Sequence, residues 1–116
     1  AAVSTAIALN ADCIITPTFY GQTARLIAHF RPKMPIYGVS PHDRAMRRMQ
    51  LYWGVYPYKG MMEESSTKIM RNSLKVLKEK GKVKKDDLVV FTAGDAATND
   101  VDGKSMTNMM NVVVVK

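Results

Sequence analysis

The chain has 116 residues and a mass of 12.9 kDa, enough for one compact domain and too little for two. Its content of 47% hydrophobic and 23% charged residues is that of a globular domain, and its longest apolar stretches fall far below the roughly 20 residues of a membrane helix. A formal charge of +7 favours an anionic partner without identifying one. The single cysteine, Cys13, excludes an intrachain disulfide framework and is typical of a cytoplasmic protein. The start at Ala1, with neither Met nor a secretory signal, indicates a segment of something longer.

Helix-like and strand-like segments alternate, which predicts an α/β domain with a mainly parallel sheet and helices on both faces. The Ala-rich residues 1–10 indicate a helix, whose buried side would hold Val3, Ala6, Ile7 and Leu9. The apolar run in residues 12–16 suits a central strand. Residues 23–30 then predict a helix ended by Pro32, with a buried stripe of Leu26, Ile27 and Phe30.

The alternation continues through the middle of the chain. Residues 35–39 predict a strand, and Ser40-Pro41 indicates the N-cap and first residue of a helix that reaches about Trp53. The inward side chains of that helix would be Ala45, Met46 and Met49. Residues 55–58 predict a third strand. A long helix capped by Ser65 or Ser66 should follow and end before Gly81, with an inner face of Ile69, Met70, Leu74 and Leu77.

Two further strands are predicted at residues 87–92 and 109–115, which completes a five-stranded sheet with three or four helices and right-handed crossovers. The terminal strand is an edge strand in this interpretation and can run antiparallel to its neighbour. Apolar residues beside it, Met106, Met109 and Met110, suggest that the edge pairs with another subunit.

The turn after the first strand is the most informative candidate site. It reads Thr-Pro-Thr-Phe-Tyr-Gly-Gln-Thr over residues 16–23 and joins a strand to a helix, where open α/β sheets place their ligand crevice. Backbone N–H groups and the positive end of the helix can hold a phosphate there, with hydroxyl donors at Thr18 and Thr23 and a close approach at Gly21. The alternative is an ordinary turn in which Thr23 is the N-cap.

A second candidate is the polar loop of residues 93–105, which carries three aspartates and one lysine, Asp95, Asp100, Asp102 and Lys104. Loops of this length are often functional, but the ligands of a calcium-binding EF-hand are missing, so a solvated loop is favoured. Neither His29 nor His42 has a partner at the spacing of a catalytic triad or metal site. A basic helix face with no accompanying motif favours solvation over nucleic-acid binding; its residues are Arg44, Arg47 and Arg48.

Taken together, short segments along nearly the whole chain resemble the C-terminal domain of pyruvate kinase. Their order and spacing are specific, although each is modest alone. The segments are Thr16-Pro17-Thr18 with Gly21 and Thr23, Thr23-Ala24-Arg25, Arg31-Pro32-Lys33-Met34-Pro35-Ile36, Gly54-Val55-Tyr56-Pro57, Asp87-Leu88-Val89-Val90 with Thr92-Ala93-Gly94, and Thr107-Asn108.

This resemblance implies that residues 1–116 form one parallel α/β domain that carries an effector site and a subunit interface of a homo-oligomer. The effector, a sugar phosphate or nucleoside monophosphate, would place its phosphate on the turn, at Thr18, Tyr20, Gly21, Gln22 and Thr23. Tyr20 replaces a small hydroxyl residue and Gln22 replaces a residue that is commonly basic, and both changes weaken phosphate binding. The effector loop would include Gly94, Asp95, Gly103 and Lys104, and its net negative charge would repel a sugar phosphate.

The resemblance also implies a parent enzyme of glycolysis that transfers phosphoryl from phosphoenolpyruvate to ADP, forming ATP, with magnesium and potassium. Metal-holding carboxylates and a cation at the moving phosphate belong to the catalytic barrel of that family, and this chain contains no barrel. We therefore expect the isolated chain to have no cofactor and no activity. One alternative is a free-standing binding protein built from the same domain. Another is a flavodoxin-like electron carrier that stacks FMN on Tyr20 or Trp53, but the rest of the chain matches the kinase domain better.

Overall fold

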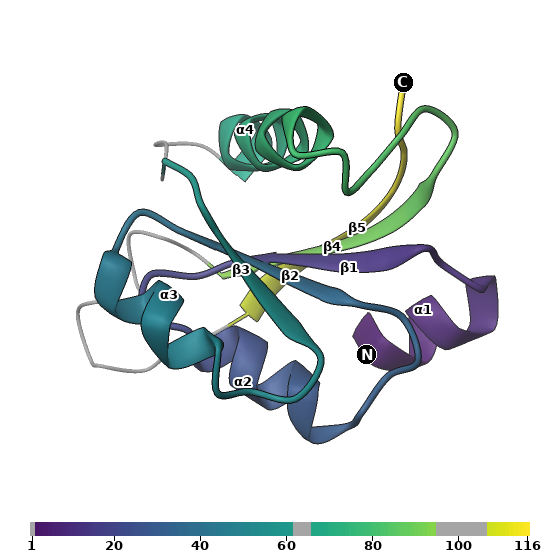
Figure 1. Ribbon diagram of the computed structural model, residues 1–116. Helices are drawn as coiled ribbons and strands as arrows, with labels where there is room; N and C mark the ends of the chain where they lie inside the picture. Colours follow the sequence, from purple (N-terminus) through teal and green to yellow (C-terminus); the bar gives the residue numbers. More distant parts are fainter. Residues whose placement is uncertain (1, 62–65, 95–106) are drawn as a thin grey trace.

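A computed structural model describes residues 2–61, 66–94 and 107–116. Helices and strands alternate along these residues as the sequence predicts (Figure 1). The elements are α1 (Ala2–Leu9), β1 (Cys13–Pro17), α2 (Gln22–His29), β2 (Ile36–Ser40), α3 (Asp43–Met49), β3 (Val55–Lys59), α4 (Ser66–Glu79), β4 (Leu88–Gly94) and β5 (Thr107–Val114). Ser65, one of the two predicted N-caps, lies outside the described residues, and so do residues 95–105 of the predicted polar loop.

The five strands form one sheet in the order β3-β2-β1-β4-β5. β1 pairs in parallel with β2 and β4, β2 pairs in parallel with β3, and β5 runs antiparallel to β4. The predicted fold class and the edge position of the terminal strand are therefore confirmed. The chain builds β1, β2 and β3 in one direction and then returns to place β4 on the other side of β1, so the topological switch point lies between β1 and β4.

Helices cover both faces of the sheet: α4 lies on one face, and α1, α2 and α3 lie on the other (Figure 1). All five residues of β1 are buried, since the strand is central and alternate side chains enter opposite layers. Cys13 and Ile15 join the apolar cluster under α4, whereas Ile14 joins the cluster under α1, α2 and α3. A continuous apolar run in the sequence thus corresponds to a strand that is covered on both sides.

The predicted buried stripes of the first two helices are wrong in part. Ile7 and Leu9 of α1 are 59% and 46% exposed, and Ala6 is the buried residue of that helix. In α2, Leu26 and the following Phe30 are also exposed, whereas Ile27 is buried together with the small residues Thr23, Ala24 and Ala28. Positions 24, 27 and 28 lie on one helical stripe, and small side chains on it let the helix lie close to the sheet.

The helix α3 begins later and ends earlier than the sequence predicts. Ser40 is the last residue of β2 rather than the N-cap, and its Oγ accepts the His42 N–H at 3.2 Å, so the helix begins at Asp43 with His42 as its N-cap. It ends at Met49. Of the predicted inward side chains, Ala45 and Met49 are buried.

The positions of α4 and of the edge strand β3 follow from local chemistry. Gly81, with φ of 73°, lies two residues beyond Glu79, the last residue of α4, so the helix ends before this glycine as predicted. On β3, the Gly54 carbonyl accepts the Ile36 N–H, and the Gly60 N–H donates to the Ser40 carbonyl. The backbone N–H and C=O groups of residues 54, 56, 58 and 60 therefore point toward β2, and those of the residues between them point away from it. Pro57 therefore lies on the outer edge, where it removes a donor that a further strand would need. None of the described helices is long and apolar enough to cross a membrane.

Candidate functional site

The predicted phosphate-binding turn lies at the carboxyl end of β1, beside the switch point of the sheet. Ile15 of β1 pairs with Phe91 of β4, so the two strands leave the sheet next to each other. The turn of residues 18–21 follows the end of β1, and the residues that follow Gly94 of β4 lie outside the described part of the chain. Open α/β sheets bind their ligands in the crevice outside such strand ends. Of the four predicted effector-loop residues, only Gly94 is described, at the end of β4.

Hydrogen bonds within the turn hold its backbone in one conformation. The Thr18 N–H donates to the Val39 carbonyl at 2.9 Å, which ties the turn to β2. The Thr18 Oγ1 accepts the Gly21 N–H at 3.0 Å, so this hydroxyl closes the turn. Gly21, with φ of 90°, is the N-cap of α2, and the alternative prediction of Thr23 as the N-cap is wrong, because Thr23 is already inside the helix. Only glycine adopts this left-handed conformation without strain.

Gly21 also has a packing role that the sequence does not reveal. A Cβ on Gly21 would lie 3.1 Å from the Cγ of Met49, and a Cβ on Gly38 of β2 would lie 2.3 Å from the Met49 Sδ. The fully buried Met49 side chain thus fills the space left by two absent side chains, one on the turn and one on β2. This packing fixes the distance between the turn and α3.

The side chains of the turn divide into buried and exposed groups. Thr18 and Thr23 are each 4% exposed, whereas Tyr20 is 51% exposed and Gln22 is also exposed. The two residues that depart from the resembled pattern, Tyr20 and Gln22, are therefore the ones that a ligand on this surface would meet first. Backbone N–H groups in the first turn of a helix have no acceptor within the helix, and they carry the positive end of its dipole.

Two residues at this site were missed by the sequence prediction. The His42 ring stacks on the Tyr20 ring, with centroids 5.3 Å apart and planes at 4°, and it lies 6.0 Å from the Phe19 ring. The Ser40 Oγ donates to the Phe19 carbonyl at 3.0 Å and so links the turn to the end of β2. Neighbouring parallel strands end at the same edge of a sheet. Ser40, which directly follows the second predicted strand, was therefore a signal available in the sequence.

Two buried hydroxyls lie at the switch point without a hydrogen-bond partner among the described residues. Thr16 and Thr92 are 0% and 1% exposed, and they occupy the positions that follow the paired residues Ile15 and Phe91. Parallel strands in register direct such side chains to the same face. An unpaired buried hydroxyl is unfavourable, so this pair indicates a place for a polar group.

These features define a doubly wound α/β domain with a closed, hydroxyl-containing turn at its topological switch point. The family described as "Pyruvate kinase, alpha/beta domain" matches residues 1–113. The chain therefore belongs to this family of pyruvate kinase C-terminal domains.

Relatives with known names agree with this assignment. The chain is 36% identical to the pyruvate kinase of Bacillus licheniformis over 96% of its own length and 18% of that protein, and 38% identical to that of Clostridium acetobutylicum over 93% and 22%. Among solved structures, Cryptosporidium parvum pyruvate kinase in complex with ADP superposes with a TM-score of 0.80 at 28% identity, over 99% of this chain and 22% of that one. The chain thus spans about one fifth of the length of these relatives, and they do not favour the free-standing alternative.

Proposed function

We propose that this chain is the regulatory and subunit-contacting domain of a pyruvate kinase. Its partner within the parent protein is the catalytic barrel, which transfers phosphoryl from phosphoenolpyruvate to ADP with magnesium and potassium. The match of residues 1–113 to the pyruvate kinase α/β domain carries this proposal. In the part of the chain that the structure describes, no three His, Cys, Asp or Glu side chains gather as metal ligands. We expect no pyruvate formation by the 116-residue chain in a coupled ADP-dependent assay, and measurable activity would contradict the proposal.

The regulatory part of the proposal is that the turn between β1 and α2 binds the phosphate of a sugar phosphate or nucleoside monophosphate. Its support is the position of the turn at the switch point, the helix N-terminus and the nearby buried hydroxyls of Thr16 and Thr92, which have no hydrogen-bond partner among the described residues. Tyr20 and Gln22 lack the compact hydroxyl and the cation that would strengthen this contact, so binding is expected to be weak.

The test is calorimetric titration of the protein with fructose 1,6-bisphosphate, ribose 5-phosphate and AMP. The Tyr20→Ser, Gln22→Arg double variant should bind at least one of them about tenfold more tightly, because charge-assisted hydrogen bonds to phosphate are strong. Gln50→Arg is the matched control: it places the same charge on an exposed residue at the end of α3. If neither the natural chain nor the double variant binds any of the three compounds, the turn is not an effector site.

The subunit-contacting part of the proposal concerns β5, which forms an open edge of the sheet. Alternate side chains of this strand are apolar and exposed: Met110 is 40% exposed, Val112 46% and Val114 53%. An apolar edge strand is a template for pairing with a second copy. In sedimentation velocity experiments we expect a dimer that Val112→Lys weakens and that Leu51→Lys, at an 84% exposed apolar residue elsewhere, leaves unchanged. A monomer at every concentration would contradict this role of β5.

A further inference from the structure

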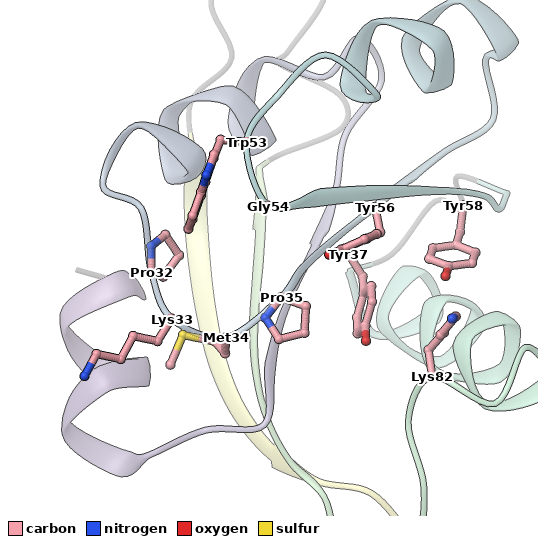
Figure 2. Close-up of a pocket in the computed structure, with 10 residues that line it drawn as sticks. All are labelled: Pro32, Lys33, Met34, Pro35, Tyr37, Trp53, Gly54, Tyr56, Tyr58 and Lys82. Carbon is pink, nitrogen blue, oxygen red and sulfur yellow. The ribbon is translucent and has the colours of Figure 1, made fainter.

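A groove with a volume of about 610 Å³ lies at the end of the sheet opposite the turn (Figure 2). Residues 32–35 precede β2 and residues 53–54 precede β3, so one end of the groove lies at the amino ends of these parallel strands. Tyr37, Tyr56 and Tyr58 extend it along the strands themselves. The turn of residues 18–21 follows the carboxyl end of β1. The volume falls within the range of pockets that bind small molecules. The groove is therefore a separate candidate site, on which the function proposed above does not depend.

Three tyrosines form one wall of the groove. Tyr37 of β2 pairs in register with Tyr56 of the edge strand β3, and their ring centroids are 6.1 Å apart. Tyr58, two residues further along β3, also lies near Tyr37, with the ring centroids 5.8 Å apart and the planes at 74°. Tyr37 is 8% exposed, whereas Tyr56 is 52% exposed. The cluster thus presents the ring of Tyr56, supported by a buried ring, to any molecule in the groove.

One lysine, Lys82, gives the tyrosine end of the groove a positive charge. Lys33 also lines the groove, but Figure 2 shows its ammonium end directed away from the tyrosines. No carboxylate lines the groove, and neither lysine forms an ion pair with a described Asp or Glu. Figure 2 shows the ammonium end of Lys82 directed toward the ring of Tyr58. At the far end, Trp53 carries the Arg31 guanidinium over its ring at 5.1 Å. Burial raises the pKa of Tyr37, so its hydroxyl keeps its proton and can donate to an anion.

We propose that this groove binds an organic anion that carries a planar ring. The ring packs against the exposed Tyr56, and the anionic group is held by Lys82 together with tyrosine hydroxyls. A free inorganic anion would leave the aromatic wall unused. A neutral aromatic compound would leave Lys82, which forms no ion pair with a described carboxylate, unused. A nucleoside monophosphate and an aromatic carboxylate share this chemistry, and the experiment below separates them.

Trp53 is the only tryptophan of the chain and lines the groove, so its fluorescence reports occupancy directly. The probes are AMP, phenyl phosphate and benzoate. Two controls each lack one part of the proposed ligand: adenosine has the ring without the anionic group, and inorganic phosphate has the anionic group without the ring. We expect a saturable change with at least one ring-bearing anion, at an affinity about tenfold higher than with either half. If only AMP of the three probes binds, the ligand is a nucleoside monophosphate. If benzoate binds, the ligand is an aromatic carboxylate. Equal affinity for inorganic phosphate or adenosine, or no saturation up to about 10 mM of any probe, would overturn the proposal.

Substitutions locate the bound probe. Lys82→Ala and Tyr56→Ala should each lower its affinity about tenfold. Lys80→Ala, at an exposed lysine just after α4 and outside the groove, should leave the affinity unchanged. Thr18→Val tests whether the same probe instead occupies the turn: loss of affinity in this variant with none in Lys82→Ala would refute binding in the groove. Urea unfolding of each variant confirms that the fold is retained.

Discussion

The contact between the turn and α3 predicts that Gly21→Ala destabilises the domain more than a comparable substitution elsewhere. Two physical effects add at this position. An alanine at φ of 90° has left-handed strain of about 1–2 kcal/mol. Its Cβ would also lie 3.1 Å from the Met49 Cγ, and crowding in a packed core costs about 1–3 kcal/mol. Met49 cannot easily move away, because it is fully buried and Gly38 confines its sulfur.

Two other glycines separate strain from crowding. Gly54 and Gly81 have φ of 70° and 73°, and a Cβ built on either meets no atom within 4 Å. Gly54→Ala and Gly81→Ala should therefore show only the strain of about 1–2 kcal/mol. The excess for Gly21→Ala, about 1–3 kcal/mol, is the contribution of the contact with Met49.

The assay is urea unfolding of each variant, followed by circular dichroism because Trp53 neighbours Gly54. The free energies are compared at equal m-values, so that a change in the unfolded state is recognised. Met49→Ala should reduce the excess cost of Gly21→Ala, since the double variant has no side chain to crowd. If Gly21→Ala lowers the free energy of unfolding no more than the two control substitutions, the turn is not held against Met49 as described.

Three further predictions concern buried polar groups. Thr18→Val leaves the buried Gly21 N–H without its acceptor and should lower the free energy of unfolding by about 1–3 kcal/mol, whereas Thr67→Val on the exposed side of α4 should not. Thr92→Val removes a hydroxyl that has no described partner and should raise the free energy of unfolding by about 1 kcal/mol; a loss instead would reveal a partner. Burial, with Asp87 and Asp12 nearby, raises the pKa of Cys13 from 9.0 to about 12, so the unfolded chain releases this proton first. The free energy of unfolding should therefore fall between pH 9 and 12 by up to about 1.4 kcal/mol per pH unit, relative to Cys13→Ala, and a parallel pH profile for that variant would refute this.

The strands could be predicted from the sequence because each carries a pattern set by its own place in the sheet. The first three residues of β1, Cys13 to Ile15, are apolar without interruption, since Ile14 and Ile15 enter opposite layers. The buried sides of the helices could not be predicted as well. Side-chain size favoured Leu26 and Phe30, but α2 packs on the sheet through Ala24 and Ala28, and this depends on how close the helix lies to the strands.

The turn could be located from the sequence because strand, hydroxyls, glycine and helix follow one another within a few residues. Its contacts with Ser40 and His42 could not, because they depend on β2 being the neighbour of β1. The order of strands in a sheet is a property of the whole chain. Once that order is assumed, however, the ends of neighbouring parallel strands can be searched together.

The groove shows the limit of a local search more clearly than the turn does. Its lining combines three separate stretches of the chain, residues 32–37, residues 53–58 and Lys82, and this lysine comes from the segment after α4. Within β3, Tyr56 and Tyr58 resemble the ordinary alternation of a strand covered on one face. The strand order shows that β3 is an edge strand, and Tyr56 on it is about half exposed. The alternating tyrosines of β3 therefore line the proposed groove, although their sequence pattern is that of an ordinary core strand.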